Sequence, residues 1–256
     1  MRSITVVIPC YNEESRLSIA SFRKFSEKYR DVTFLFVDDG SNDKTPSLLR
    51  GLNSKHPDRF HVLSLERNKG KGEAVRQGIL RALSYESAFV GYWDADLATP
   101  LTVIPLFVDV FETRPGTEVV LGARLKSLGR CIERRPSRHY GGRIIATAIS
   151  LITGLYVYDS QCGAKLFRRT KELVEVFSTS FVSRWLFDVE VLLRLLNIRR
   201  AQSMQDINRL LYELPLPAWY HVKGSKITFW DCTCIPIELY RIRMAYGSLF
   251  SHIDRK

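Results

Sequence analysis

The sequence is short of cysteine, and it lacks the cysteine pairs that organise disulfide-rich folds and most structural zinc sites. Its 256 residues include five cysteines, none of which forms a C-x-x-C pair. A chain of this length buries an adequate core without cross-links, so a disulfide framework is excluded. Cys232 and Cys234 form one C-x-C with no second ligand pair nearby, which disfavours a zinc site. We therefore expect reduced cysteines and a cytoplasmic protein.

Long apolar runs and two common nucleotide-binding motifs are also missing. The longest stretch without a charged residue is the 15 residues 144–158, whereas a membrane-spanning helix needs about 20 apolar residues. Pro9 interrupts the apolar run at the start of the chain, which argues against a signal peptide. The chain has no P-loop spacing, and no Gly-x-Gly-x-x-Gly follows the first predicted strand, which disfavours a dinucleotide oxidoreductase.

Basic residues, in contrast, are in excess. The chain has 38 Lys and Arg against 27 Asp and Glu, a formal net charge of +11. Such an excess indicates an anionic partner, which at this point is a nucleic acid, a nucleotide or a membrane surface. Much of it lies between Arg124 and Arg143, where Glu133 is the only acidic residue in the sequence, and the uncharged run 144–158 follows directly. Nucleic acid is disfavoured, because Tyr140 alone interleaves with these arginines as a base-stacking aromatic.

Short apolar segments alternate with helical patterns in the first half of the chain. The predicted strands are 5–9, 33–38, 60–65, 89–94 and 118–122. The predicted helices are 13–29, 72–83 and two that begin at the N-cap-and-proline pairs Thr45-Pro46 and Thr99-Pro100. This alternation predicts an α/β fold with a mostly parallel sheet covered by helices on both faces.

Polar residues gather where the predicted strands end, which is the edge at which such sheets bind ligands. Asp94 and Asp96 follow the fourth strand at a spacing that lets both carboxylates reach Mg²⁺ or Mn²⁺ while leaving sites for diphosphate oxygens. A simpler interpretation is that Asp96 only caps a turn. The pair Asp38 and Asp39 contacts a base or ribose, orders the turn that follows, or does both. Lys69 and Lys71 lie among glycines in a loop that we expect to face phosphate groups.

These motifs together resemble a known family. The segments V-I-P-C-Y-N-E (7–13), V-D-D-G-S (37–41), N-K-G-K-G (68–72) and D-A-D (94–96) are similar to inverting family 2 glycosyltransferases of GT-A fold over about the first 125 residues. Segments 159–167, 184–190 and 224–226 resemble the polyprenyl-phosphate branch. Ala98 and Gln161-Cys-Gly make the chain more similar to dolichyl-phosphate β-glucosyltransferases than to the mannose synthases, which usually carry a metal-holding Gln where Ala98 stands.

The resemblance implies a hexosyltransferase that moves a hexose, preferably glucose from UDP-glucose, to a polyprenyl or dolichyl phosphate. It implies that the nucleoside contacts a set of residues in the first two loops, namely Pro9, Tyr11, Glu13, Val37 and Asp39. It places Asp94, Ala95 and Asp96 at the sugar, the diphosphate and a Mg²⁺ or Mn²⁺ ion. Lys71, Arg124 and Lys226 are expected at the donor phosphates.

The arginine-rich segment is the predicted acceptor site. Arg134, Arg135 and Arg138, with Gln161, are expected to bind the lipid phosphate, and 144–158 either lies along the lipid chain or packs in the core. A phosphate acceptor is already anionic and needs no general base, and Asp159 and Asp188 are the candidates if one is needed. Arg124, Asp159 and Asp188 complete the predicted catalytic set with the D-A-D carboxylates.

The predicted domain organisation is a glycosyltransferase domain at 1–226, with a donor half (1–125) and an acceptor half (126–226), and a helical extension at 227–256. The extension lies on a membrane, forms a dimer contact or packs in the core. We expect a protein peripheral at the cytoplasmic face of a membrane, although the dolichyl enzymes usually have spanning segments. The alternatives are a family 2 enzyme that acts on a saccharide hydroxyl, and a catalytically silent module that binds nucleotide or lipid phosphate.

Overall fold

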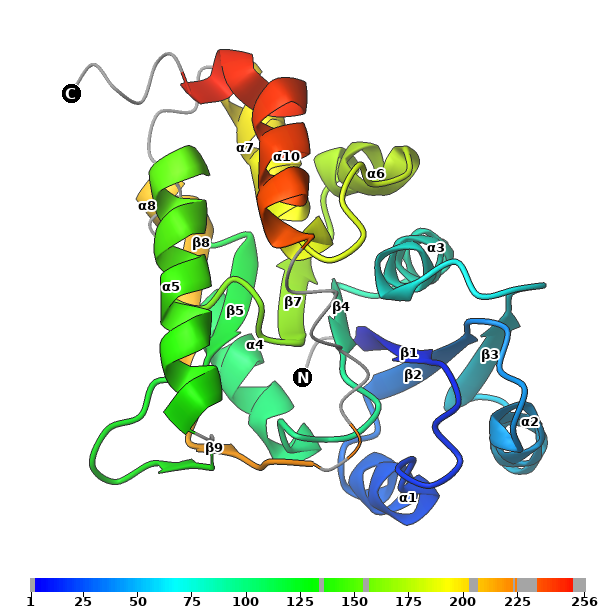
Figure 1. Cartoon of the computed structure of the whole chain (residues 1–256). Coiled ribbons are helices and arrows are strands. Elements are labelled where there is room, and N and C mark those ends of the chain that lie inside the picture. The colour runs from blue at the N-terminus through cyan, green and yellow to red at the C-terminus, as the bar shows by residue number, and fades with distance from the viewer. Residues whose placement is uncertain are drawn as a thin grey trace.

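The structure is a computed structural model that describes residues 3–133, 136–153, 157–202, 207–222, 224 and 234–250. It contains a seven-stranded sheet in the order β3-β2-β1-β4-β7-β5-β8 and a two-stranded sheet of β6 and β9 (Figure 1). The strands of the large sheet are β1 (Ile4–Cys10), β2 (Val32–Asp38), β3 (Phe60–Ser64), β4 (Phe89–Trp93), β5 (Val119–Ala123), β7 (Ala164–Arg168) and β8 (Leu211–Pro215). The small sheet pairs β6 (Cys131–Ile132) with β9 (Ala218–Trp219).

Six of these seven strands run parallel, which confirms the predicted mostly parallel sheet. The exception is β7, which pairs antiparallel with β4 on one side and with β5 on the other. Because β7 runs against β4, the residues that precede β7 lie at the carboxyl end of β4. Trp93 pairs with Ala164, which puts Gly163 beside Asp94. This one reversed strand therefore brings a turn from the second half of the chain to the ligand-binding edge.

Helices cover both faces of the sheet, as the apolar strands require. On one face lie α1 (Ile19–Lys28), α2 (Thr45–Lys55), the short 3₁₀ helix η1 (Leu101–Val103) and α4 (Ile104–Thr113). On the other lie α3 (Lys71–Leu83), α6 (Lys171–Ser178) and α7 (Phe187–Ala201). The remaining helices are α5 (Pro136–Thr153), α8 (Ile207–Leu210) and α10 (Ile235–Phe250).

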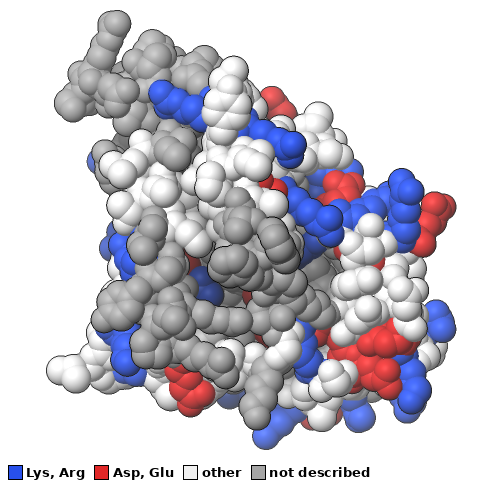
Figure 2. Space-filling model, viewed as in Figure 1, with Lys and Arg blue, Asp and Glu red and all other residues white. Residues whose placement is uncertain are grey.

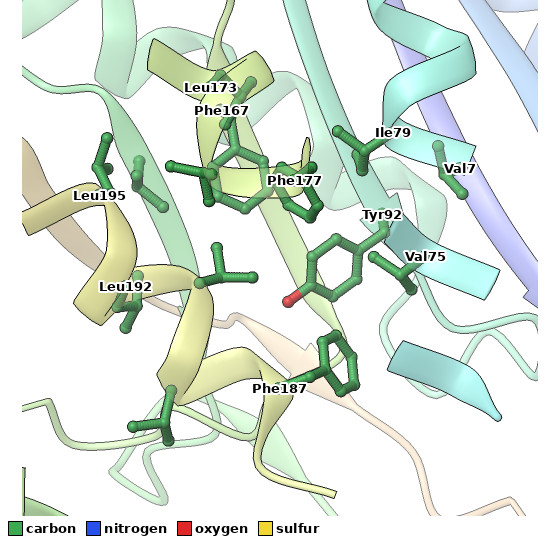
Figure 3. Close-up of a cluster of buried hydrophobic side chains, with 14 of the residues drawn as sticks. Val7, Val75, Ile79, Tyr92, Phe167, Leu173, Phe177, Phe187, Leu192 and Leu195 are labelled. Carbon is green, nitrogen blue, oxygen red and sulfur yellow. The ribbon is translucent and has the colours of Figure 1, made fainter. Parts of the chain in front are cut away.

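The side chains of β1 show how one strand serves two cores. Ile4, Val6 and Ile8 belong to the core under α1 and α4, whereas Val7 belongs to the core under α3 and α7. This alternation is the period of two expected of a strand buried on both faces. In the second core Tyr92 lies between α3 and α7, and its hydroxyl points toward α7 (Figure 3). The Tyr92 hydroxyl is therefore a polar group within this apolar layer, just below the sheet edge.

Helix starts differ from the predicted positions in three places. The helix predicted at 13–29 begins only at Ile19, because residues 13–18 form the loop after β1, and Ser18 caps the helix. Thr45 is the first helical residue and not the N-cap, and its hydroxyl accepts a hydrogen bond from the backbone of Glu13 instead (2.8 Å). After Thr99-Pro100 the chain forms η1 before α4 begins. For Thr45, a contact between the loops at the sheet edge replaces helix capping.

Helices α5 and α10 pack against each other, and α10 also packs against α7. The uncharged run 144–158 is helical as far as Thr153, where α5 ends, and within it Ile149 is buried and Leu151 is exposed. The predicted tail helix is α10, which buries Leu239 and Ile242. None of the helices in the described part of the chain is long and apolar enough to cross a bilayer. The predicted domain division near residue 226 lies at the edge of undescribed residues and stays a prediction.

Candidate active site

Asp94 and Asp96 lie in a tight turn at the carboxyl end of β4. The Asp94 backbone N–H donates to the carbonyl of Gly163 (3.0 Å), and the Leu97 N–H donates to the carbonyl of Asp94 (3.2 Å). One carboxylate oxygen of Asp96 accepts from the Ala98 N–H (3.1 Å), as the turn-capping interpretation predicted. Its other oxygen is 3.8 Å from a guanidinium nitrogen of Arg16. Asp96 therefore both shapes the turn and presents charge to the site.

Two basic side chains face these carboxylates. The Lys71 ammonium lies 2.6 Å from Oδ1 of Asp94. Burial disfavours the charged lysine, but Asp94 and Asp188 outweigh it and raise the pKa of Lys71, so that it stays cationic. Burial and the neighbouring Asp94 raise the pKa of Asp96. Lys71 is the first residue of α3 and thus lies beside the D-A-D carboxylates.

The carboxylates fit a metal that is shared with a substrate. Within the described residues, no cluster of three or more His, Cys, Asp or Glu side chains is placed to hold a metal ion. A protein cage for zinc or calcium is therefore not formed there, whereas Mg²⁺ and Mn²⁺ commonly take one or two carboxylates and complete their shell with phosphate oxygens and water. The Asp94 side chain is 36% exposed, so it is open to such a ligand.

Hydrogen bonds of two buried carboxylates fix the loops after β1, β2 and β3. Buried Glu13 accepts from the Arg16 side chain (Nε to Oε2, 2.8 Å). Buried Asp39 accepts from the backbone N–H groups of Lys69 and Gly70 (2.7 and 2.8 Å), which shapes the glycine-lysine loop. Burial raises the pKa of Asp39 although these bonds oppose the rise. Both predicted nucleoside-binding carboxylates therefore also have a clear architectural role.

The other residues predicted to bind the nucleotide-sugar donor differ in how exposed they are to solvent. Pro9 and Tyr11 are half-buried at the sheet edge. Val37 is fully buried, with its side chain in the core, and Ala95 is also buried. Any contact that Val37 makes with a nucleoside must therefore come from its backbone.

The predicted bases are both engaged by basic groups. Asp159 accepts a bidentate pair from Arg124, with the guanidinium Nε and a terminal nitrogen each 2.7 Å away. Asp188 lies in the first turn of α7 and accepts from the fully buried Lys165 ammonium (2.5 Å) and from the Tyr92 hydroxyl. Both carboxylates are therefore paired with cations in the structure.

Two arginines of the arginine-rich segment make contacts that hold the fold together. Arg130 donates to the carbonyl of Pro215, and Arg143 donates to the carbonyl of Tyr158 (2.8 Å) and stacks on its ring. Arg134, Arg135 and Lys226 lie outside the described residues, as does the side chain of Arg138. Gln161 is half-buried beside this region, and its amide nitrogen is buried with no hydrogen-bond partner in the described part of the chain.

Sequence reasoning missed several residues that the fold brings to the edge. Arg16 lies within the loop after β1, but its partners Asp96 and Gly224 are distant in sequence. Arg184 lies over Gly70, with its Nε 3.2 Å from where a Cβ on that glycine would stand. On the face shown in Figure 2, basic and acidic side chains lie side by side toward α1, α2 and α3.

Comparisons with known proteins agree with this geometry. The model of the family "Glycosyl transferase family 2" matches residues 5–174. Dolichyl-phosphate beta-glucosyltransferase of Drosophila melanogaster is 30% identical over an alignment of 261 positions, which covers 95% of this chain and 75% of the relative. The enzyme of the same name from Homo sapiens is 29% identical and covers 96% of this chain and 76% of its own.

A solved structure shares the fold. Mycobacterium tuberculosis glucosyl-3-phosphoglycerate synthase in complex with Mn²⁺, UDP-glucose and phosphoglyceric acid superimposes with a TM-score of 0.66. The two chains are 19% identical, and the match covers 96% of this chain and 80% of the other. The likeness shows that the mixed sheet and its helices form a GT-A fold.

Proposed function

Because this chain belongs to glycosyl transferase family 2, we propose that it transfers a glucosyl group from UDP-glucose to a polyprenyl phosphate such as dolichyl phosphate. The observation that carries the proposal is the extent of the similarity to the dolichyl-phosphate beta-glucosyltransferases. It spans 95–96% of this chain in the fly, yeast and human relatives. The similarity therefore includes the acceptor half and not the donor half alone.

The donor site in this proposal is the edge formed by the ends of β1, β2 and β4. Asp94 and Asp96 hold a Mg²⁺ or Mn²⁺ ion, and Lys71 contacts the donor diphosphate. The bound metal offsets the negative charge that develops on the departing nucleoside diphosphate. The M. tuberculosis glucosyl-3-phosphoglycerate synthase, which shares the fold, binds UDP-glucose together with Mn²⁺, and this supports the assignment.

The acceptor chemistry explains why no free base is needed. A phosphate monoester carries about −1.5 to −2 charges at pH 7. Its oxygen forms a bond to the anomeric carbon while the bond from that carbon to the diphosphate oxygen breaks, and the electron pair leaves with UDP. No proton has to be removed. Attack from the side opposite to UDP inverts an α-linked donor to a β-linked product, and Asp159 and Asp188 are left to orient Arg124 and Lys165.

The proposal is tested by turnover with defined acceptors. Purified protein is incubated with UDP-glucose, Mn²⁺ and either a short-chain polyprenyl phosphate, phosphoglyceric acid or a neutral oligosaccharide. We expect transfer to the lipid phosphate alone, and loss of that transfer when EDTA removes the metal. Transfer to the oligosaccharide but not to the lipid phosphate favours the alternative family 2 function. Binding of UDP-glucose without any transfer favours a silent binding module.

Gln161 provides a specific test of the acceptor site. Its buried amide nitrogen is a hydrogen-bond donor without a partner in the described part of the chain, and such a group is stabilised by a ligand that accepts the bond. We propose that this ligand is the acceptor phosphate. Gln161→Ala is then expected to raise the KM for polyprenyl phosphate about tenfold, with little change in the KM for UDP-glucose. Equal changes in both constants, measured by initial rates, would contradict the assignment.

The helix pair of α5 and α10 is the surface that we propose for contact with the membrane. Ile237, Tyr240 and Met244 of α10 are exposed, and so are Arg241 and Arg243 on the same helix. Exposed apolar side chains beside arginines match the boundary of an anionic bilayer. Figure 2 shows the basic side chains over α10 at the top of the view.

The double substitution Ile237→Ser and Met244→Ser tests this contact. It removes two exposed apolar side chains, so the fold should be retained while binding to the bilayer weakens. We expect a several-fold loss of co-sedimentation with vesicles that contain anionic phospholipid, and unchanged transfer to a detergent-solubilised short-chain acceptor. Val174→Ser, at an exposed site on α6, is the control. Undiminished vesicle binding by the double variant is the result that rejects α10 as the contact surface.

A further inference from the structure

Each carboxylate of the D-A-D turn faces a basic side chain of this chain. Asp94 pairs with the Lys71 ammonium at 2.6 Å, and Asp96 lies 3.8 Å from the Arg16 guanidinium. Arg16 is itself held in place by Glu13 and by the carbonyl of Gly224 (2.9 Å). Asp94 is therefore paired directly with a cation that the fold supplies, whereas Asp96 shares the Arg16 guanidinium with Glu13.

This arrangement disfavours a divalent cation that arrives alone. Such an ion must separate Lys71 from Asp94, and it then lies beside both the ammonium and the guanidinium, whose charges repel it. A nucleoside diphosphate changes the balance, because its oxygens bring negative charge that both the metal and the displaced lysine can contact. The free energies of metal and diphosphate binding are then coupled, and the coupling is reciprocal.

We propose that Lys71, assisted by Arg16, is a built-in counter-cation that keeps the D-A-D site from binding a divalent cation until a nucleoside diphosphate is present. The inference rests on the proposed function, because it takes that function's metal and donor as the ligands. Lys71 therefore has two positions, one on Asp94 in the empty site and one toward the diphosphate in the loaded site.

The geometry leaves Lys71 room to move. The Lys71 and Asp94 side chains are 38% and 36% exposed, so water can reach both charged groups when they separate. Lys71 is also the first residue of α3, directly after Gly70 with its positive φ of 92°. A flexible lysine stem at the start of a helix can swing without disturbing the strands below. Arg16, tied to Glu13 and Gly224, is the less mobile of the two.

The test measures Mn²⁺ binding directly, by the electron paramagnetic resonance signal of free Mn²⁺, with and without UDP. Lys71→Met removes the counter-cation and frees Asp94. We expect it to bind Mn²⁺ alone about tenfold more tightly than the wild type, and UDP to increase its Mn²⁺ affinity by a correspondingly smaller factor. Lys55→Met, which removes the same charge from an exposed position at the end of α2, is the control for net charge and should leave Mn²⁺ binding unchanged.

Three outcomes separate this inference from the proposed function. If the wild type takes up Mn²⁺ with UDP but Lys71→Met binds Mn²⁺ alone no more tightly than the wild type, the counter-cation role is wrong and the donor site stands. If Lys55→Met shows the same increase, the effect is one of net charge and the specific role of Lys71 is rejected. If the wild type takes up no Mn²⁺ even with UDP, the proposed metal site and this inference fail together.

Discussion

Gly163→Ala is expected to lower the rate of glucosyl transfer by a factor on the order of 100 or more while the protein stays folded. A Cβ at position 163 would lie 1.9 Å from Oδ2 and 2.2 Å from Cγ of Asp94, which is far inside van der Waals contact. The Asp94 side chain must therefore rotate away, and its pair with Lys71 breaks. Small displacements of groups that position a reacting centre commonly cost about 10²-fold in rate.

The measurements are kcat and KM for UDP-glucose at saturating acceptor, together with Mn²⁺ binding in the presence of UDP. We expect the substitution to weaken Mn²⁺ binding and lower kcat. Gly51→Ala is the matched control, because nothing lies within 4 Å of the Cβ that it adds in α2, and alanine there favours the helix. A Gly163→Ala enzyme with wild-type Mn²⁺ binding and wild-type kcat would show that Asp94 is not held by this glycine.

Asp94→Asn helps to interpret the result. It removes the charge without adding an atom, so it should lower Mn²⁺ binding and activity at least as much as Gly163→Ala. If the glycine variant loses its fold, which circular dichroism shows, the Asp94 variant still reports on the carboxylate. If the two variants both fold and differ sharply in Mn²⁺ binding, the steric explanation is insufficient.

The sequence predicted the first half of the sheet closely, because its strands are short apolar runs between turn residues. The five predicted strands correspond to β1–β5 with bounds within one residue. The importance of Gly163 was not predictable in the same way, since it depends on β7 running antiparallel between β4 and β5. Strand order and direction are set by tertiary packing, and no local pattern around 164–168 encodes them.

The candidate site shows the same division between local and distant information. Asp94, Asp96 and Lys71 were found from spacing within single loops. The ion pairs that define their state link distant segments, such as Arg124 with Asp159 and Lys165 with Asp188. Asp159 and Asp188 therefore looked like candidate bases in the sequence, whereas each has a basic partner in the structure. The role of a carboxylate depends on the charged group that it contacts. Here that group is distant in the sequence, so the sequence alone does not identify it.

Lys165→Met is expected to destabilise the protein by about 3–5 kcal/mol, because it leaves the Asp188 carboxylate buried without its cation. The Lys165 side chain is fully buried and that of Asp188 is 5% exposed. The ammonium lies 2.5 Å from Oδ1 of Asp188 and also donates to the carbonyl of Cys162 (2.5 Å). This one lysine joins the start of α7 to the turn that carries Gly163, just beneath the D-A-D site.

The double variant Lys165→Met and Asp188→Leu separates an ion-pair effect from loss of packing. With both charges removed no unpaired charge is left, so the double variant should lose much less free energy of unfolding than the sum of the two single losses. Urea unfolding followed by circular dichroism measures these values, with Lys171→Met at an exposed position of α6 as the control. Additive losses would contradict a coupled pair.

Measurable transfer by this double variant, which has no carboxylate at position 188, would also show that Asp188 is not the base, as expected for an acceptor that is already anionic.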